Sequence, residues 1–160
     1  MIIGVTGTIG SGKDEIRKFL EKEFNLITIK LSDIVKIFLT KENYSRKELQ
    51  DTGNFLRKSF GNDILVRIAI FFIKDNLIID GIRNVGEVKF LRKSFGKKFI
   101  LISVDADEKV RFERLRKRSR EDDPKSYEEF LEIDKRDKGF NEPEYGQQTL
   151  KCMEMADIKI

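Results

Sequence analysis

Glycine and lysine residues near the start of the chain are spaced in a way that suits the binding of an anion. Residues 7–14 read GTIGSGKD, which fits the pattern GxxxxGK between an apolar run and an amphipathic segment. Glycines let the backbone wrap so that several N–H groups point at one anion, and the lysine then reaches the β- and γ-phosphates of a nucleotide. The predicted phosphate ligands are Gly7, Thr8, Ile9, Gly10, Ser11, Gly12, Lys13 and Asp14.

Asp14 departs from this pattern, because serine or threonine usually follows the lysine. A carboxylate is a hard oxygen ligand that could bind Mg²⁺ directly or through water. An acidic residue in the first turn of a helix is also favoured by the helix dipole alone. The sequence leaves both interpretations open, and we predict Asp14 as a metal ligand.

A second acidic residue follows a short apolar run. Residues 77–79 are Leu-Ile-Ile and precede Asp80, and a strand of this kind delivers a carboxylate to the magnesium shell beside a phosphate loop. Gly81 would let a substrate approach the backbone, and the Arg83 guanidinium could bind a phosphate with two hydrogen bonds. A surface arginine after a tight turn is the alternative for Arg83. We predict Asp80 as the second magnesium ligand.

Three arginines further along share one face of a predicted helix. Arg111, Arg114 and Arg118 are spaced i, i+3 and i+7, which places them within about sixty degrees of one another. Converging guanidiniums would neutralise the charge that develops on a phosphoryl group, and Arg120 could move in when the site closes. A solvated basic face and a nucleic-acid-binding helix are the alternatives. Acidic residues at 121–123 and 128–129 would repel a polyanion, so we expect a lid and no nucleic acid partner.

Apolar periodicity predicts the elements that must position these residues. Strands are expected at 1–6, 26–30, 77–79, 99–104 and 158–160. Helices are expected at 14–24, 33–40, 45–60, 62–74, 85–95, 107–119, 126–138 and 145–155, with Ser32 as a possible N-cap. This alternation predicts a parallel sheet with helices on both faces. Ligands collect beyond the carboxyl ends of such strands, where the glycine loop, Asp33, Asp80, Arg83 and Asp105 all fall.

Composition limits the class of protein. The 160 residues are expected to form a single domain, and 32 Lys and Arg against 28 Asp and Glu give a modest net charge of +4. One cysteine, Cys152, cannot form an internal disulfide, which favours a reducing compartment. No apolar run is long enough for a membrane helix. We therefore expect a cytoplasmic protein with no membrane partner, either a monomer or a homodimer.

The motifs resemble, in kind and in order, those of P-loop nucleotide kinases. They are GTIGSGKD, IIDGIR, RFERLRKR and DDPKSYEEF, followed by GQQ and MAD. Over nearly the whole chain the sequence is similar to adenylate-kinase-related and dephospho-CoA-kinase-like proteins of archaea and small bacteria, and to phage deoxynucleoside-monophosphate kinases. The resemblance implies an α/β, three-layer P-loop NTPase fold with a five-stranded parallel sheet. It also implies acceptor-binding helices at 31–75 and a small arginine-rich lid at about 118–140.

The same resemblance implies an activity: transfer of the γ-phosphoryl group of Mg-ATP to a (deoxy)nucleoside monophosphate. Dephospho-CoA kinase is the close alternative, and a non-catalytic nucleotide-binding or regulatory domain is a further one. By the resemblance Lys13, Arg83, Arg114 and Arg118 are catalytic, and Arg114 also contacts ATP. Asp33 lies where dephospho-CoA kinases keep an acid near the acceptor hydroxyl, and an aspartate that merely opens a helix is the equal alternative.

The acceptor side is expected on the helix at 45–60. Arg46, Gln50, Asn54 and Arg57 form a polar stripe in the region that faces the acceptor in deoxynucleotide kinases, although a solvated face has the same pattern. Asp33, Asp80 and Arg83 complete the predicted acceptor set. The chain has no histidine, so proton removal would fall to a carboxylate. Related kinases continue beyond the position of Ile160, so weaker nucleotide binding or a longer parent protein is expected.

Overall fold

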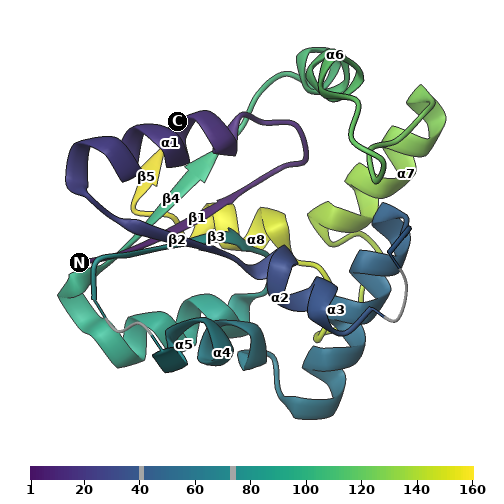
Figure 1. The fold of residues 1–160 in the computed structure, drawn as a ribbon. Helices are drawn as coiled ribbons and strands as arrows, with labels where there is room; N and C mark the ends of the chain where they lie inside the picture. The colour runs from purple at the N-terminus through teal and green to yellow at the C-terminus, as the bar shows by residue number, and fades with distance from the viewer. Residues whose placement is uncertain (40–41, 73–74) are drawn as a thin grey trace.

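A computed structural model of the chain describes residues 1–39, 42–72 and 75–160. Its centre is one sheet of parallel strands in the order β2-β3-β1-β4-β5. The strands are β1 (Ile2–Gly7), β2 (Ile27–Lys30), β3 (Leu77–Ile82), β4 (Phe99–Val104) and β5 (Ile158–Lys159). The predicted parallel α/β fold is confirmed, and Figure 1 shows helices on both sides of the sheet.

The helices mostly follow the predicted ranges. They are α1 (Lys13–Phe24), α2 (Leu31–Ile37), α3 (Arg46–Phe60), α4 (Ile64–Phe72), α5 (Val85–Phe95), α6 (Glu108–Arg118), α7 (Tyr127–Lys138) and α8 (Thr149–Glu154), with a 3₁₀ turn at Gly96–Lys98. The predicted helix ends at Thr40 and Lys74 lie outside the described residues. None of the described helices has the length and apolar character needed to span a membrane.

The start of α2 differs from the prediction. Ser32 was expected to cap a helix from residue 33, but α2 begins at Leu31 and Lys30 occupies the N-cap position. The reason is that β2 runs directly into α2 without a loop. This change turns Ser32, and not Asp33, toward the strand ends.

Alternation along the strands divides the core into two layers. Ile3 and Val5 of β1, with their neighbours on β3 and β4, pack against Leu20 of α1 on one face of the sheet. Ile2 and the alternate residues of β3 and β4 pack on the other face against α2, α3, α4 and α5. Strands covered on both faces read as continuous apolar runs, which is why 77–79 and 99–104 were recognisable. These two layers and the sheet make the predicted three-layer fold.

Local chemistry fixes where several helices begin. The Ser45 hydroxyl accepts from the N–H of Glu48, whose carboxylate accepts from the N–H of Ser45 in return, and Asn84 and Glu87 form the same reciprocal cap at α5. Ser126 caps α7 through the N–H of Glu129. Each cap satisfies backbone donors that a helix start leaves unpaired. The predicted starts near residues 45 and 85 are therefore confirmed by geometry that the sequence itself encodes.

The helices α6 and α7 have a small apolar cluster of their own. Ile9, Leu115, Phe130 and Ile133 are buried together, and the rings of Phe112 and Tyr127 meet edge to face at 5.1 Å. Ile9 belongs to the glycine loop, so this cluster ties both helices to that loop. Figure 1 shows α6 and α7 beyond the carboxyl ends of the strands, with α7 beside α3.

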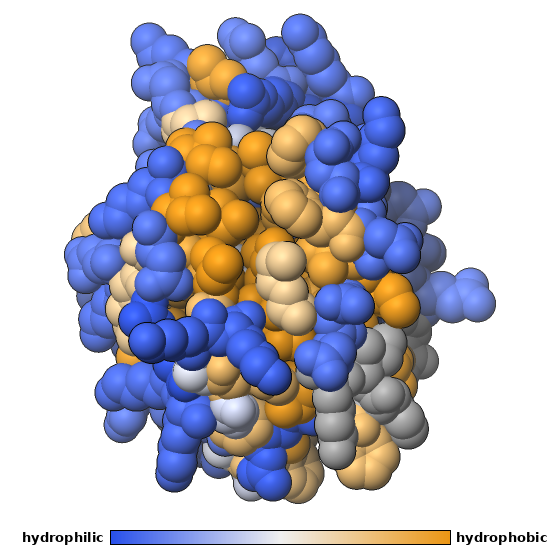
Figure 2. Space-filling model, turned by 90° about the vertical axis from the view of Figure 1, so that its left-hand side faces the viewer, coloured by the Kyte–Doolittle hydropathy of each residue, from blue (hydrophilic) through white to orange (hydrophobic). Residues whose placement is uncertain are grey.

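The opposite end of the sheet carries exposed apolar surface. Met1, Phe24 and Ile27, near the amino ends of β1 and β2, are 42%, 50% and 55% exposed. The space-filling view of this side, the left of Figure 1, shows a broad apolar area (Figure 2). The polar cavity described next lies at the other end of the strands.

Candidate active site

The loop between β1 and α1 is shaped by glycines that no other residue could replace without strain. Gly10 and Gly12 have φ of 76° and 104°, in the region that favours glycine. A Cβ on Gly10 would lie 2.6 Å from the backbone oxygen of Arg111, and one on Gly12 would lie 3.2 Å from Nη1 of Arg114. The loop thus wraps tightly beneath α6 and opens toward the start of α1.

Lys13 lies over this loop and is partly buried. Its Nζ donates to the backbone oxygens of Gly7 and Thr8 at 2.8 and 2.7 Å. Burial, with a smaller contribution from the Arg83 charge, lowers the pKa of Lys13 from 10.5 to about 8. Lys13 therefore lies at the cavity wall as an ammonium group whose charged form a bound anion would favour, because an opposite charge nearby raises the pKa of a lysine.

Asp80 lies within β3, which extends beyond the predicted strand to Ile82, and it is buried. Its Oδ2 lies 3.9 Å from Nε of Arg17, and its Oδ1 has no hydrogen-bond partner among the described residues. Burial raises the pKa of Asp80, the Lys13 charge opposes that rise, and the nearby Asp14 carboxylate adds to it. A buried carboxylate oxygen without a partner requires a cation or a donor from outside the protein.

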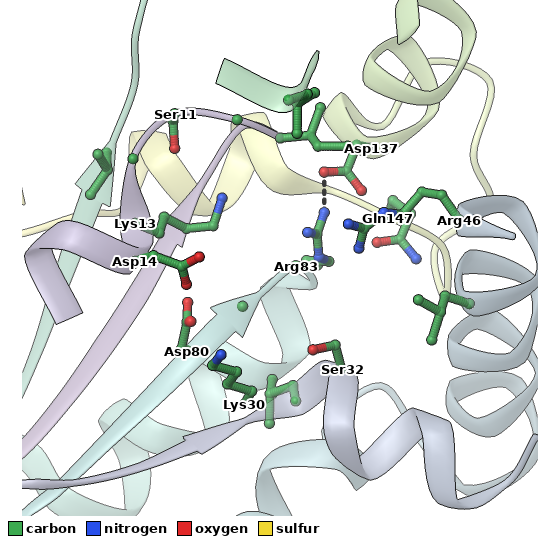
Figure 3. Close-up of a pocket in the computed structure, with 18 of the residues that line it drawn as sticks. Ser11, Lys13, Asp14, Lys30, Ser32, Arg46, Asp80, Arg83, Asp137 and Gln147 are labelled. Atoms are coloured by element: carbon green, nitrogen blue, oxygen red, sulfur yellow. Dashed lines mark ion pairs between the residues drawn. The ribbon is translucent and has the colours of Figure 1, made fainter. Parts of the chain in front are cut away.

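Asp14 lies in the first turn of α1, and its carboxylate points toward that of Asp80 on β3 (Figure 3). Burial would raise the pKa of Asp14, but the hydrogen bond and charge of Arg120 outweigh it and hold the pKa below its ordinary value. The Arg120 Nη2 lies 2.9 Å from Oδ2 of Asp14. Two facing carboxylates beside a phosphate loop fit Mg²⁺, which takes one or two carboxylates together with waters and substrate phosphates. Among the described residues no group of three or more His, Cys, Asp or Glu side chains could hold a metal.

The three arginines of α6 do not converge as predicted. Arg111 is buried and bonds both oxygens of Asp134 on α7, with Nη1–Oδ1 at 2.5 Å and Nη2–Oδ2 at 3.0 Å. It also donates to the backbone oxygen of Ile9 at 3.1 Å. The prediction is wrong for Arg111 because a buried acidic partner on α7 engages its guanidinium. Arg111 joins the loop, α6 and α7, and does not face the cavity.

Arg114 and Arg118 do line the cavity. Arg114 Nη1 donates to the backbone oxygen of Ser11 at 2.8 Å, which places its charge at the rim of the glycine loop. Arg118 pairs with Asp123 through two hydrogen bonds. Arg120 and Asp105 also line the cavity, and Asp105 accepts from Oγ1 of Thr8 at 2.6 Å.

The polar stripe on α3 is buried, so it is not a solvated face. Gln50, Asn54 and Arg57 are 4%, 7% and 2% exposed. Arg46, Gln50 and Arg57 line the cavity, whereas Asn54 lies behind it and donates to Oε2 of Glu142 at 2.6 Å. Burying three polar side chains in one stripe is costly unless their polar atoms are hydrogen-bonded, either to other protein groups or to a ligand.

Arg83 points into the cavity from the loop after β3 and forms an ion pair with Asp137 of α7 (Figure 3). Burial alone would raise the pKa of Asp137, but the charges of Arg83 and Arg46 hold it below its ordinary value. Arg46 in turn lies 2.9 Å from Asp122 through Nη2 and Oδ2. Arg83 and Arg46 are therefore both held by acidic residues of the segment 118–140.

Asp33 does not join the other predicted residues. Its carboxylate is largely exposed and pairs with Nζ of Lys36 at 2.9 Å, one turn further along α2. Ser32 and Lys30 line the cavity in its place. Lys30 is the residue of β2 in register with Asp80 of β3, which brings a second lysine to the acidic pair.

Sequence reasoning missed Asp137 and Gln147, which both line the cavity. The range 145–155 was predicted as one helix, but α8 begins only at Thr149. Residues 142–148 instead form a loop, because Nδ2 of Asn84 donates to the backbone oxygens of Glu144 and Gly146, both at 2.9 Å. The GQQ motif was the only signal for Gln147. Its place depends on Asn84, which is far away in the chain.

The side chains named above as lining the cavity enclose a volume of about 640 Å³. The glycine loop, Lys13, Asp14 and Asp80 form one half, and Arg46, Gln50, Arg57, Arg83 and Gln147 form the other. Figure 3 shows Arg83 between the two halves. A pocket of this size suits one or two small ligands, and the polar groups are of the kind that orient them.

Sequence comparisons relate the chain to archaeal proteins. A sequence model described as "AAA domain" matches residues 3–135. A UPF0200 protein of Methanocaldococcus jannaschii is 35% identical over 150 residues, covering 88% of this chain and 74% of that protein. A UPF0200 protein of Thermococcus onnurineus is 35% identical over 148 residues, covering 84% and 77%.

Structural comparisons concern the fold alone. Shikimate kinase from Bacteroides thetaiotaomicron superimposes with a TM-score of 0.59 at 16% identity, covering 100% of this chain and 85% of that one. The protein TT1252 from Thermus thermophilus gives a TM-score of 0.57 at 17% identity, covering 99% and 86%. The chain thus shares its fold with P-loop kinases.

Proposed function

Since the chain belongs to the UPF0200 family and has a P-loop kinase fold with an AAA-domain match, we propose that it is an ATP-dependent phosphotransferase. Its acceptor is a nucleoside monophosphate or a similar small nucleotide. The observation that supports this proposal is that the glycine loop and Lys13 share one continuous cavity with a second set of basic and amide side chains. One hollow can therefore hold the phosphoryl donor and the acceptor together.

We call the half with the glycine loop, Lys13, Asp14 and Asp80 the donor half, and the half with Arg46, Gln50, Arg57, Arg83 and Gln147 the acceptor half. The donor half would bind the ATP phosphates. The loop amides and Lys13 contact the β- and γ-phosphates, and Arg114 and Arg118 neutralise charge on the transferring group. Asp14 and Asp80 would hold Mg²⁺, which would offset the charge of the phosphates when bound. An acceptor oxygen attacks the γ-phosphorus, the bond to the β–γ bridging oxygen breaks, and ADP leaves with that oxygen. In this proposal positioning and charge account for most of the catalysis.

A phosphate acceptor suits the acceptor half better than a hydroxyl does. A phosphate oxygen is already negatively charged, whereas a hydroxyl needs a base to take its proton. Asp137 is the carboxylate of this half, and it is held by Arg83 and accepts from Gln50 Nε2 at 3.2 Å. Its lowered pKa makes it a poor base. For this reason we place nucleoside monophosphates ahead of dephospho-CoA.

The segment 118–140 would act as the lid of this site. It reaches both halves, because Arg120 bonds Asp14 on the donor side while Asp122 and Asp137 pair with Arg46 and Arg83 on the acceptor side. In each pair a carboxylate lies where a phosphate would otherwise be attracted. Binding of substrates would exchange these carboxylates for phosphates.

The proposal is tested by incubating the protein with Mg-ATP and a mixture of ribo- and deoxynucleoside monophosphates plus dephospho-CoA. Mass spectrometry then identifies which compound gains one phosphate. We expect one or a few monophosphates to gain it. A gain on dephospho-CoA alone would select the alternative acceptor. ATP binding without any acceptor-dependent ADP would indicate a non-catalytic nucleotide-binding domain and would refute the proposal.

Activity should fall on the alkaline side with the titration of Lys13. Below pH 8 the ammonium is charged and attracts phosphate, and above its pKa of about 8 the charge is lost. We expect kcat/KM for ATP to decrease about tenfold per pH unit above this value, because this parameter reports the free enzyme. A pH series of initial rates measures the effect. The variant Lys13→Arg stays charged over the whole range, so any residual activity should show no alkaline decrease. An alkaline decrease that persists in Lys13→Arg would contradict its assignment to Lys13.

Gly53 in the middle of α3 leaves room beside the acceptor subsite. A Cβ there would lie 3.4 Å from Nη1 of Arg57 and 3.8 Å from Cγ2 of Val35, which is ordinary contact. We expect Gly53→Ala to raise the free energy of unfolding by about 0.5–1 kcal/mol, since alanine is the better helix former. The added methyl group enters the acceptor half, so the acceptor KM should rise while the ATP KM stays the same.

Urea unfolding and initial-rate kinetics measure both effects. Ser59→Ala is the matched control, because Ser59 lies exposed near the end of the same helix. It should leave the acceptor KM unchanged. A Gly53→Ala protein with an unchanged acceptor KM would place the acceptor elsewhere.

A further inference from the structure

Two buried amide groups in the acceptor half have a fixed orientation. Gln50 Nε2 donates to Oδ1 of Asp137 at 3.2 Å and to the backbone oxygen of Ile133 at 3.4 Å. Both partners only accept hydrogen bonds, so the nitrogen of Gln50 must face them. The carbonyl oxygen of Gln50 is thereby turned the other way, and it has no partner among the described residues.

Gln147 is oriented by a longer chain of hydrogen bonds. Glu142 accepts from Nδ2 of Asn54 at 2.6 Å, which fixes the Asn54 amide. The Asn54 oxygen then accepts from Nε2 of Gln147 at 3.1 Å. The carbonyl oxygen of Gln147 is left over, and it too has no partner in the part of the chain that the structure describes. A carboxylate thus sets the direction of each amide.

Arg57 supplies the complementary group. Its Nε and Nη2 both bond Oε1 of Glu87, at 2.9 and 2.8 Å, and this pair is buried. Its Nη1 is buried without a described partner, and it lies above Gly53, where there is no side chain. Arg57, Gln50 and Gln147 all line the cavity and are 2%, 4% and 2% exposed.

Leaving such groups unpaired in a folded protein is expensive, and native structures leave few of them. Two hydrogen-bond acceptors and one donor are left over, and each belongs to a side chain whose other polar atoms are already hydrogen-bonded to the protein. Together they form a template for a ligand that offers two donors and one acceptor. Such a template discriminates strongly, because a ligand that lacks one group leaves a buried atom unpaired. The template lies in the half that the proposed function assigns to the acceptor.

Building on that function, we propose that Gln50, Gln147 and Arg57 select the acceptor. The two amide oxygens accept hydrogen bonds from two N–H or O–H groups of the acceptor, and Arg57 Nη1 donates to one of its oxygens. The acceptor is therefore an anionic nucleotide that presents paired donors. Those donors belong either to the exocyclic amino group of a base or to the hydroxyls of a ribose.

The test measures binding and does not depend on phosphoryl transfer. Calorimetry with a non-hydrolysable ATP analogue present would give the Kd of CMP, dCMP, UMP, dUMP, AMP, dAMP, IMP and dIMP. If the paired donors belong to a base amino group, CMP should bind at least ~10-fold more tightly than UMP, or AMP than IMP. If the paired donors belong to the ribose hydroxyls, each ribonucleotide should bind at least ~10-fold more tightly than its deoxy form.

Gln147→Met and Gln50→Met remove the oxygens and keep the side-chain length. We expect either variant to reduce the preference to within about twofold. Gln148→Met is the matched control, because the Gln148 amide oxygen instead accepts from the backbone of Val85 at 3.1 Å, and its preference should equal that of the wild type. Equal binding of all members, no binding of any member, or a preference that survives in both variants would overturn the inference. Selective binding without transfer would instead contradict the phosphotransferase function alone.

Discussion

Replacing Lys13 by methionine should lower kcat/KM for ATP by ~10³-fold or more, which is the scale found for groups that neutralise a transferring phosphoryl group. Methionine fills similar space without the charge, and the two hydrogen bonds to Gly7 and Thr8 are lost. The fold should persist, since the lowered pKa of Lys13 shows that burial already disfavours its charge. Steady-state ADP release with the preferred acceptor measures the effect.

Lys18→Met is the matched control for this experiment. Lys18 lies on α1, as Lys13 does, but it is exposed and, among the described residues, pairs with Glu15 at 3.3 Å. Its loss should leave turnover within about twofold of the wild type, because exposed ion pairs contribute little. An unchanged rate in Lys13→Met, with circular dichroism showing a folded protein, would refute the role of the glycine loop in ATP binding.

Replacing Arg111 by methionine should destabilise the protein by about 3–5 kcal/mol, because it leaves the carboxylate of Asp134 buried without its main partner. The side chains of this pair are only 2% and 3% exposed. Lys138 lies 2.7 Å from Oδ2 of Asp134 and replaces part of the lost charge, so the lower end of the range applies if it can follow. Urea unfolding measures the loss.

Two further variants separate the cost of a buried charge from the value of the pair. The double change Arg111→Met with Asp134→Leu should recover most of the stability, since apolar side chains can replace a buried ion pair at little cost. Arg116→Met alters an exposed arginine of the same helix and should change stability by less than about 0.5 kcal/mol. If Arg111→Met proved as mild as Arg116→Met, the joint between α6 and α7 would not rest on this pair.

The donor half of the site was predictable because its signals are local. The pattern of residues 7–14 requires particular backbone angles, and Gly10 and Gly12 adopt them. An apolar strand leads to Asp80, and the carboxyl ends of parallel strands share one edge of the sheet, so the sequence placed Asp80 on the same rim as the glycine loop. The pairing of β3 with β1, which makes the two direct neighbours, came from the structure.

Which arginines of α6 line the cavity and which one is buried in an ion pair was not predictable. Arg111, Arg114 and Arg118 look alike on a helical face, but Asp134 of α7 meets only the first. Likewise, a shift in the start of α2 exchanged Asp33 for Ser32 at the cavity. Both outcomes depend on the exact rotation of a helix against a partner, which periodicity does not specify.

By itself the sequence determined the parallel α/β fold and predicted the glycine loop, Lys13, Asp14 and Asp80 as one group, because the alternation of strands and helices, glycine backbone angles and helix caps are properties of short segments. Only the tertiary structure decided the acceptor half. The polar stripe of α3 becomes a buried wall when α7 packs on it, and Gln147 arrives through a loop held by Asn84. Those contacts join residues far apart in the chain, so their energy appears only when the whole molecule is assembled.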